Sequence, residues 1–486
     1  MKRRKLEETE NNEKKQPKQK RNSNPQIALL TYVFLGLFLV MIGYIAYFVQ
    51  VEGKKAINNP YNKRQELLAK KITRGSIFSA EGEVLAETVT DDMGKESRYY
   101  PYGRVFCHVV GRVSNSYTGI ELSQCFPMLT SSTNGLEQIF HEIVGEKSDG
   151  DNVVTTLNYE LQKIAYESLG NHKGAVVAME PSTGKILAMV SKPDYDPNTV
   201  AEEWEELLGN EEEDSALVNR ATQGLYPPGS TFKILTALEY LQENGNGKDY
   251  QYECKGSATY GGNTIRCYGG EVHGSLDLEK SFAESCNASF ATMGTGLQIN
   301  KFKELCEKFL FNKMLPLDFE HNRSSFSLTE GAKEAEVTHT SIGQGETLIS
   351  PLHNAMITAT IANKGVMMKP YVVDHVENVN GRIVTEYKPK KVGRIITKKE
   401  AKKMKKLMKA VVTEGTATAL QTDRYEAAGK TGTAEFDSSG SSHAWFVGYA
   451  PAKNPKIVVS IIVEGAGTGS AYAVPIAKKL FDAYLE

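Results

Sequence analysis

The sequence predicts an α+β fold in which one antiparallel sheet, flanked by helices, collects strands from both ends of residues 151–486. Two apolar runs near residue 180 are separated by Glu180-Pro181-Ser182-Thr183-Gly184, a pattern typical of a β-hairpin. Two more apolar runs lie near the C-terminus, and an amphipathic helix follows them from Ile476 to Leu485. Helical patterns lie between the two groups, so segments far apart in the chain close the sheet. The four expected strands are 175–179, 185–190, 444–449 and 456–463.

Length and composition indicate a globular protein of two or three domains. The 486 residues exceed one average domain, and 40% apolar with 24% charged residues can build a large core. The formal net charge of −2 and the lack of a basic, aromatic array argue against nucleic-acid binding. Six cysteines without a C-x-x-C pair or a His-rich cluster argue against a disulfide scaffold, and no metal or cofactor is expected.

The N-terminal segment predicts a membrane anchor behind a basic tail. Residues 1–26 are polar and mostly basic, so we expect them to be disordered. Residues 27–49 are uncharged and apolar, and as a helix they would extend about 34 Å, enough to cross a bilayer. No clear small-x-small cleavage site follows, which favours a retained anchor over a cleaved signal or a buried core helix. The positive-inside tendency then places the tail in the cytoplasm and everything after Gln50 outside.

Residues 50–150 contain short elements and no catalytic constellation. Turn signals such as Glu81-Gly82 separate these elements. We therefore expect a small membrane-proximal α+β domain with a structural, dimerisation or interaction role.

Two charged runs need no ligand to explain them. Glu211–Asp214 is expected to be a solvated loop rather than a metal site, because adjacent carboxylates in a loop repel each other. Lys398–Lys409 is expected to be the solvated face of a helix that Thr397 and Glu400 cap. That interpretation is preferred to a site for anionic lipid or cell-wall polymer.

The first candidate for chemistry is the stretch Tyr226-Pro227-Pro228-Gly229-Ser230-Thr231-Phe232-Lys233. Its prolines and glycine predict a stiff turn, and the apolar residues that follow recur at helical spacing. Ser230 is therefore expected on the first turn of a helix, where Lys233 can reach its hydroxyl. A lysine whose pKa is lowered by burial or nearby positive charge can deprotonate a serine. The helix N-terminus also favours the oxyanion that forms when an acyl carbon is attacked.

Two further motifs would complete an acyl-transfer site. Ser285-Cys286-Asn287 follows a predicted helix at 276–284, and its hydroxyl can pass a proton to a leaving group while its amide orients a peptide bond. Lys430-Thr431-Gly432-Thr433 lies in a strand-like segment. Its amine and hydroxyls can bind a carboxylate, and Gly432 leaves room for a substrate backbone. Lys430 close to Lys233 would also lower the pKa of Lys233.

Each motif alone is a weak signal. A capped amphipathic helix explains Ser230 and Lys233 equally well. Ser182-Thr183-Gly184-Lys185 repeats the first motif, and we interpret it as a hairpin loop with a solvated lysine. Ser132-Thr133-Asn134 repeats the second, and we interpret it as a surface turn. The three motifs together, in this order, carry the interpretation.

Because the motifs at Ser230, Ser285 and Lys430 occur in this order, the sequence resembles a class B penicillin-binding protein, a monofunctional bacterial peptidoglycan D,D-transpeptidase. The likeness covers nearly everything after the tail. It implies a fold like that of serine β-lactamases and transpeptidases, with an all-helical subdomain, in residues 151–486, preceded by a pedestal-like domain in residues 50–150. The other segments that carry the resemblance are 59–64, 74–77, 135–137, 194–198, 219–221, 273–274, 343–345 and 445–448.

The resemblance also implies the reaction and its residues. Ser230 would form an acyl-enzyme from the D-Ala-D-Ala end of a stem peptide and pass the acyl group to an amine of a neighbouring stem. Lys233 would be the base and Ser285 the proton relay. β-Lactams would acylate the same serine, no metal or cofactor would be needed, and a SEDS-type glycan polymerase would be the membrane partner. The implied substrate-binding groups are Asn287 for the donor amide and Lys430, Thr431, Gly432 and Thr433 around the terminal carboxylate, with the N–H groups of Ser230 and Thr433 as oxyanion hole.

Some features depart from the family or leave alternatives open. Phe78–Gly82 replaces the Asp-Arg-Asn-Gly-like turn that usually follows Arg-Gly-x-Ile, which concerns the membrane-proximal fold and not the active site. Cys254 and Cys267 could form a disulfide outside the membrane or stay as two reduced thiols. Cys286 is interpreted as a buried packing thiol rather than a reactive one.

Competing functions are less well supported. A β-lactamase of the same clan must deacylate quickly, and no Glu-x-x-Leu-Asn-like segment follows Asn287 to activate water. A D,D-carboxypeptidase belongs to the same clan and is the other enzymatic alternative. A non-catalytic scaffold is disfavoured because the three motifs are intact. A β-lactam sensor would need a larger cytoplasmic part than the short tail.

Overall fold

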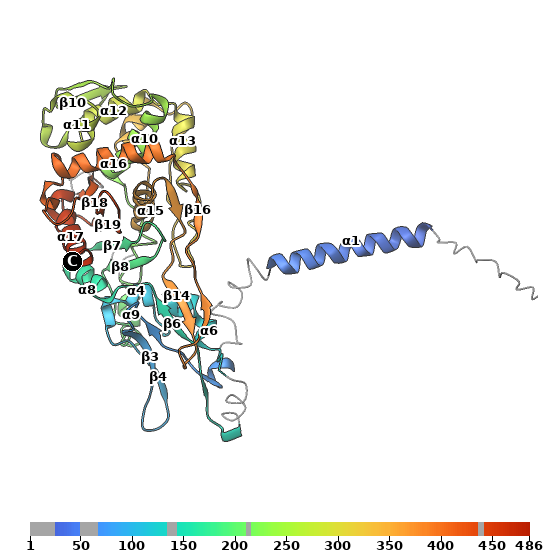
Figure 1. Cartoon of the computed structure of the whole chain (residues 1–486). Helices are drawn as coiled ribbons and strands as arrows, with labels where there is room; N and C mark the ends of the chain where they lie inside the picture. Colours follow the sequence, from blue (N-terminus) through green and yellow to red (C-terminus); the bar gives the residue numbers. More distant parts are fainter. Residues whose placement is uncertain (1–24, 49–66, 134–142, 210–214, 436–441) are drawn as a thin grey trace, which may run out of the picture. The chain divides into compact units, whose positions relative to one another are not determined.

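The computed structural model describes residues 25–48, 67–133, 143–209, 215–435 and 442–486 (Figure 1). The chain divides into two compact units, Met1–Asn59 and Pro60–Glu486, and each is described by itself. Several predictions lie outside the described residues: the basic tail, the segments 59–64 and 135–137, Asn134 of the second Ser-x-Asn, and the acidic run 211–214.

In the first unit, helix α1 (Pro25–Tyr47) coincides with the predicted anchor. It is 23 residues long, its most apolar window has a mean hydropathy of 2.3, and none of its side chains is buried. A helix of this length and composition can cross a bilayer. The predicted apolar N-terminal helix is therefore confirmed, while its orientation stays a prediction.

A five-stranded antiparallel sheet is the centre of the C-terminal part of the second unit, with strand order β17-β18-β19-β7-β8. Strand β19 pairs with β7, so segments far apart in sequence close the sheet as predicted. Every residue of β18 and β19 is buried because helices cover both faces. The strands are β7 (Gly174–Met179), β8 (Ile186–Lys192), β17 (Ala428–Glu435), β18 (Ser442–Ala450) and β19 (Ile457–Val463).

The helices on this sheet come from three parts of the chain. Helices α8 (Tyr159–Leu169) and α17 (Gly469–Tyr484) contact each other and the sheet on one side (Figure 1). Helix α15 (Pro351–Ala362) is buried along its whole length against β7, β18 and β19. The predicted α+β architecture with a flanked antiparallel sheet is confirmed.

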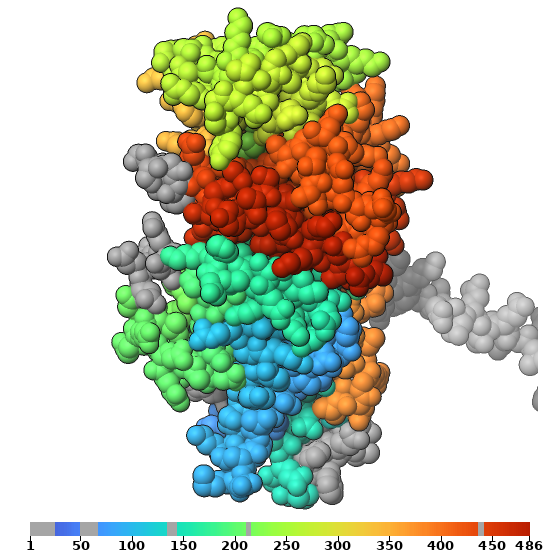
Figure 2. Space-filling model, turned by 90° about the vertical axis from the view of Figure 1, so that its left-hand side faces the viewer, coloured from blue at the N-terminus to red at the C-terminus, as the bar shows by residue number. Residues whose placement is uncertain are grey.

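A mostly helical head lies beyond one end of this sheet (Figures 1 and 2). The resemblance implied an all-helical subdomain, but the head also contains two small antiparallel pairs, β10 with β11 and β9 with β12. Its helices are α10 (Lys233–Glu243), α11 (Leu278–Ala283), α12 (Asn287–Thr295), α13 (Ile299–Lys308), α14 (Glu334–Ser341) and α16 (Lys398–Thr413). Its strands are β9 (Tyr252–Cys254), β10 (Ser257–Tyr260), β11 (Asn263–Arg266) and β12 (Gly274–Leu276).

Helix α16 confirms the interpretation of the lysine-rich run. The Thr397 and Glu400 side chains form the predicted capping box. Met404 and Met408 are fully buried, while most of the lysines point to solvent or pair with acidic side chains, as Lys406 does with Glu279. The run is the polar face of an amphipathic helix.

The N-terminal part of the second unit contains a six-stranded sheet with order β15-β14-β6-β2-β3-β4. Its last two strands in the chain, β14 and β15, come from within residues 373–386, so the sheet combines segments from both sides of the expected boundary at residue 150. That boundary stays a prediction. The strands are β2 (Ile77–Phe78), β3 (Val84–Thr90), β4 (Glu96–Tyr99), β6 (Asn152–Thr155), β14 (Val373–Glu377) and β15 (Ile383–Glu386).

Short elements complete the second unit. The Lys185 loop between β7 and β8 is the predicted hairpin, but its lysine is not simply solvated, because Nζ lies 2.7 Å from Oδ1 of Asp374. The turn Phe78–Gly82 caps helix α8, since the Glu81 carboxylate accepts the N–H of Tyr159 at 3.0 Å. The remaining elements are β1 (Ile72–Thr73), η2 (Gly103–Val105), α4 (Cys107–Val110), α5 (Gly119–Ser123), α6 (Cys125–Met128), β5 (Ser148–Asp149), α9 (Trp204–Gly209), η4 (Gly229–Phe232), η5 (Tyr268–Gly270), β13 (Val366–Met368), β16 (Lys391–Arg394) and η6 (Thr418–Leu420).

Candidate active site

The candidate nucleophile Ser230 lies in the 3₁₀ turn η4, which leads directly into helix α10. Its predicted place on the first turn of a helix is therefore confirmed. Gly229 has a φ of 52°, and a Cβ there would lie 2.8 Å from the carbonyl oxygen of Thr433. Glycine is needed because the turn approaches strand β17 too closely for a side chain. The Ser230 hydroxyl is thus held beside that strand.

The Lys233 amine lies fully buried behind the site. It donates to the carbonyl oxygen of Ser285 at 2.6 Å, to Oδ1 of Asn287 at 2.7 Å and to Oγ of Ser285 at 3.2 Å. Among the described residues no hydrogen bond joins Lys233 to Ser230, and its amine contacts the Ser285 loop, whose three oxygens satisfy the three N–H groups of an ammonium. Burial lowers the pKa of Lys233 to about 7. A substantial fraction of this amine is neutral near pH 7, as a general base requires.

The Lys430 amine approaches the same hydroxyl from strand β17. It donates to Oγ of Ser285 at 2.8 Å and to the carbonyl oxygen of Thr431 at 3.0 Å. Burial holds the pKa of Lys430 well below its usual value, and the charge of Lys233 lowers it further. Burial is also the largest cause of the lowered pKa of Lys233. Neither amine forms an ion pair within the described residues.

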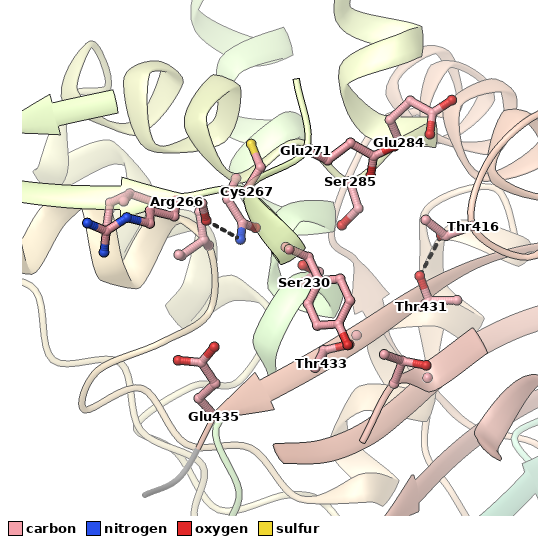
Figure 3. Close-up of a pocket in the computed structure, with 18 of the residues that line it drawn as sticks. Ser230, Arg266, Cys267, Glu271, Glu284, Ser285, Thr416, Thr431, Thr433 and Glu435 are labelled. Atoms are coloured by element: carbon pink, nitrogen blue, oxygen red, sulfur yellow. Dashed lines mark hydrogen bonds between the residues drawn. The ribbon is translucent and has the colours of Figure 1, made fainter. Parts of the chain in front are cut away.

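Ser285 lies between helices α11 and α12 with a φ of 57°, an uncommon conformation for a residue with a side chain. Such strained positions occur often at active sites. Asn287, the first residue of α12, accepts from Lys233 and donates through Nδ2 to the carbonyl oxygen of Arg266 at 3.0 Å (Figure 3). The Ser-x-Asn loop thus places one hydroxyl between two amines.

Strand β17 carries the third motif at the edge of the five-stranded sheet, where among the described strands it pairs only with β18. An edge strand presents backbone groups that an extended peptide can pair with. The structure gives a different reason for Gly432 than room for substrate. A Cβ there would lie 2.9 Å from Cβ of Trp445 and 3.1 Å from Cγ2 of Thr231. Glycine is needed for β17 to pack against η4 and β18.

The Thr431 hydroxyl pairs with Thr416, a residue that the sequence did not indicate. The two Oγ1 atoms are 2.5 Å apart (Figure 3). Thr433 also lies on the strand and lines the cleft (Figure 3). Of the predicted hydroxyls for a carboxylate, one already has a protein partner.

A cleft of about 520 Å³ brings the three motifs together (Figure 3). Ser230, Ser285, Asn287, Thr431, Gly432 and Thr433 line it, while the two lysines lie behind Ser285. Among the other residues lining the cleft, His273 and Gln344 lie in segments 273–274 and 343–345 of the resemblance, while the rest carry no local sequence signal and are brought here only by the fold. The polar ones among all these other residues include Arg266, Glu271, His273, Glu284, His339, Gln344, Thr416 and Glu435.

The cysteines near the cleft are free thiols in this structure. The Sγ atoms of Cys254 and Cys267 are 3.7 Å apart, well beyond the disulfide bond length of about 2.05 Å. Cys286 is fully buried, as predicted, and its Sγ lies 3.6 Å from that of Cys267.

Comparisons with known proteins agree with this geometry. The family described as "Penicillin binding protein transpeptidase domain" matches residues 174–482. The peptidoglycan D,D-transpeptidase PbpA of Mycolicibacterium smegmatis is 32% identical over 465 residues, which is 88% of this chain and 92% of that protein. The peptidoglycan D,D-transpeptidase MrdA of Acinetobacter baumannii is 29% identical, over 80% of this chain and 66% of that protein.

Solved structures give the same result. Penicillin-binding protein A from M. tuberculosis, as a penicillin G acyl-enzyme complex, has a TM-score of 0.77 and 31% identity, over 86% of this chain and 100% of that chain. The D,D-transpeptidase domain of a peptidoglycan glycosyltransferase from Eggerthella lenta has a TM-score of 0.77 and 32% identity, over 85% of this chain and 98% of that chain.

Proposed function

The chain belongs to the penicillin-binding protein transpeptidase family, as a class B penicillin-binding protein, and on that premise we propose how its residues carry out the reaction. It is a serine-type peptidoglycan D,D-transpeptidase, which cross-links stem peptides through an acyl-enzyme that β-lactams also form. Ser230 is the nucleophile, Lys233 the base and Ser285 the proton relay.

In acylation, Oγ of Ser230 attacks the carbonyl carbon of the penultimate D-Ala. The C–O bond forms while Lys233 takes the hydroxyl proton. The C–N bond then breaks, and the leaving D-Ala nitrogen receives a proton through the Ser285 hydroxyl. In transfer, the acceptor amine attacks the ester carbon and gives up a proton, and Ser230 leaves with its hydroxyl proton restored.

One observation carries this assignment: the Ser285 hydroxyl lies 3.2 Å from the Lys233 amine and 2.8 Å from the Lys430 amine, with both amines buried. A hydroxyl between two amines can exchange a proton with either of them. When a substrate carboxylate binds beside Lys430, its negative charge stabilises an ammonium there. Lys233 then remains neutral and available as the base.

The substrate's place follows from the edge strand. The terminal carboxylate binds beside Lys430, Thr431 and Thr433, and the peptide lies along β17 past Gly432. Asn287 holds the donor amide with the second N–H of its Nδ2. The backbone N–H groups of Ser230 and Thr433 form the oxyanion hole, which is favoured by the start of a helix and the close approach of η4 to β17.

Membrane attachment is the second element of the proposal. Helix α1 spans the membrane once with the basic tail in the cytoplasm, so the catalytic part, residues 151–486, lies outside.

Residues 50–150 act as the pedestal, and they and α1 bind a SEDS-type glycan polymerase. Exchange of Pro25–Tyr47 for an unrelated apolar helix should reduce co-purification of that polymerase. Undiminished association would count against α1 as part of the contact.

Labelling with penicillin tests the nucleophile. The full chain in detergent should carry one penicillin on the peptide that contains Ser230, and the adduct should persist for hours. Ser230→Ala should abolish labelling, whereas Ser182→Ala, in the repeated motif, should not change it. A label on another residue would overturn the assignment of Ser230, and rapid turnover of the drug would indicate a β-lactamase.

A further inference from the structure

Four potential metal ligands meet beside the Ser-x-Asn loop, and together they are called the Cys₃His cluster. They come from separate elements: Cys254 ends β9, Cys267 follows β11, His273 precedes β12 and Cys286 caps helix α12. The pairing of β9 with β12 sets Gly274 opposite Cys254 and so brings His273 beside that thiol. One ligand atom from each residue lies within 4.8 Å of every other.

The separations fit ligands around one tetrahedral ion. The Sγ atom of Cys267 lies 3.7 Å from that of Cys254 and 3.6 Å from that of Cys286. Zinc–sulfur bonds of about 2.3 Å at tetrahedral angles put two sulfurs about 3.8 Å apart. Nδ1 of His273 lies 3.3 Å from Sγ of Cys254, close to the value of about 3.5 Å for a sulfur and a nitrogen ligand of one zinc ion.

The surroundings of the cluster suit negatively charged sulfur. The thiols are at most 3% exposed, and the His273 side chain is 7% exposed. The N–H of Gly256 donates to Sγ of Cys254, and the N–H of Ser289 donates to Sγ of Cys286, both at 3.4 Å. Nε2 of His273 lies 3.8 Å from the Glu271 carboxylate. Donors to thiolates and a carboxylate behind a ligating imidazole are the usual supports of a metal site.

We propose that the Cys₃His cluster binds one zinc ion. Thiolate and imidazole ligands in a tetrahedron select zinc over harder cations such as magnesium and calcium. Four protein ligands leave no open coordination position, so the ion has a structural role and takes no part in acyl transfer. A disulfide explains the cluster less well, because it would use two thiols and leave the third and the imidazole without a function.

The ion would hold the catalytic loop in place. Cys286 lies between Ser285 and Asn287, whose oxygens hold the Lys233 amine. Cys267 follows Arg266, whose carbonyl oxygen binds Asn287, and it lines the cleft (Figure 3). Zinc therefore positions the Ser-x-Asn loop from behind. This second step rests on the proposed function, whereas the metal site itself does not.

Metal content tests the site directly. The full chain, purified in detergent without chelator, should contain about one zinc ion per chain, measured by inductively coupled plasma mass spectrometry. Cys267→Ala should lose it, and His273→Ala should reduce it at least several-fold. Cys306→Ala is the matched control, because Cys306 is also a fully buried free thiol but lies in α13, outside the cluster. It should keep the ion.

A second measurement does not depend on the folding of a variant. After removal of zinc, the wild-type chain with Co²⁺ should show the visible absorption of tetrahedral cobalt bound to thiolates. A wild-type chain without zinc that gives no such spectrum would overturn the proposal. Retention of zinc by Cys267→Ala would also overturn the proposal. A disulfide between two of these cysteines, detected by alkylation without reductant, would do the same.

Acylation by fluorescent penicillin separates this proposal from the proposed function. Removal of zinc should slow acylation at least tenfold, and its return should restore the rate. A zinc-bound chain that penicillin does not label would refute the role of Ser230 and leave the metal site standing. Acylation that is unchanged after zinc removal would refute the positioning role.

Discussion

Two regions of this protein bury charged groups, and they do so in opposite ways. In the N-terminal part of the second unit, the Glu121 carboxylate lies 2.7 Å from Arg74 and 2.7 Å from Arg98, with all three side chains at most 9% exposed. In the active site, Lys233 and Lys430 are buried with no carboxylate among the described residues as a partner. The Glu121 carboxylate thus has opposite charges beside it, whereas the two active-site amines have no carboxylate partner among the described residues.

The pKa values follow this difference. Although burial opposes it, the charges of Arg98 and Arg74 hold the pKa of Glu121 below its usual value. Burial lowers the pKa of Lys233 to about 7, and no carboxylate among the described residues pairs with this amine to offset that effect. The paired charges around Glu121 stay ionised and serve a structural role. A buried amine without such a partner loses its proton near neutral pH and can act as a base.

The largest expected effect is at the uncompensated site. Lys233→Ala should slow acylation by penicillin about 10³- to 10⁴-fold, which is about 4 to 5 kcal/mol in the activation barrier. The free energy of unfolding should change only modestly, because removal of a buried amine without a carboxylate partner offsets the loss of its three hydrogen bonds. Stopped-flow fluorescence measures the acylation rate, and urea unfolding measures the free energy of unfolding. A stable variant that acylates at the normal rate would break the comparison.

The compensated cluster should respond in the opposite way. Glu121→Gln leaves two buried guanidinium groups without a carboxylate and should cost about 3–5 kcal/mol of unfolding free energy. Acylation per folded molecule should stay the same. Glu96→Gln is the control, because Glu96 pairs with Lys147 in a partly exposed bridge and should cost about 1 kcal/mol or less. Equal losses for the two variants would contradict the account.

The strand that carries Lys430 gives a smaller effect. Gly432→Ala forces a Cβ to within 2.9 Å of Cβ of Trp445, and such overpacking should cost about 1–3 kcal/mol. Because β17 would move relative to η4, acylation should slow as well. Gly393→Ala in β16, where nothing lies within 4 Å of the added Cβ, should change neither quantity. Unfolding curves and acylation rates that do not distinguish the two variants would rule out this packing role.

The smallest effect is expected at the surface. The ion pair of Lys185 with Asp374 leaves about a third of each side chain exposed. Lys185→Ala should therefore cost under about 1 kcal/mol, and less at high salt. Although this lysine belongs to a repeated Ser-x-x-Lys, penicillin labelling should not change. A loss comparable to that of Glu121→Gln would mean that exposure does not set the value of these ion pairs.

Local patterns in the sequence predicted much of this. The turn at Pro227-Pro228-Gly229 and the helical spacing after it placed Ser230. Continuous apolar runs placed four of the five central strands, and strand-like composition indicated the fifth. These signals are local because turn geometry and periodicity depend on near neighbours. Long-range partners had no such signal. The hydrogen bonds of Lys233 to the Ser285 loop, and the pairing of Thr416 with Thr431, follow only from how helices and strands meet.

The Cys₃His cluster also depends on contacts between residues that are far apart in the sequence. Its four residues are spread from Cys254 to Cys286, so no short spacing indicates a metal site, and one pair of them could equally form a disulfide. The participation of strand β14 in the six-stranded sheet was also not predicted, because the segment lies far beyond the other strands in the chain.

The pH dependence of acylation tests the central claim most directly. Because Lys233 acts as a base only when neutral, the second-order rate constant for penicillin should rise about tenfold per pH unit below the pKa of about 7 and level off above it. A rate that keeps rising to pH 10, as an ordinary lysine would give, or one that is flat from pH 5 to 9, would contradict the account.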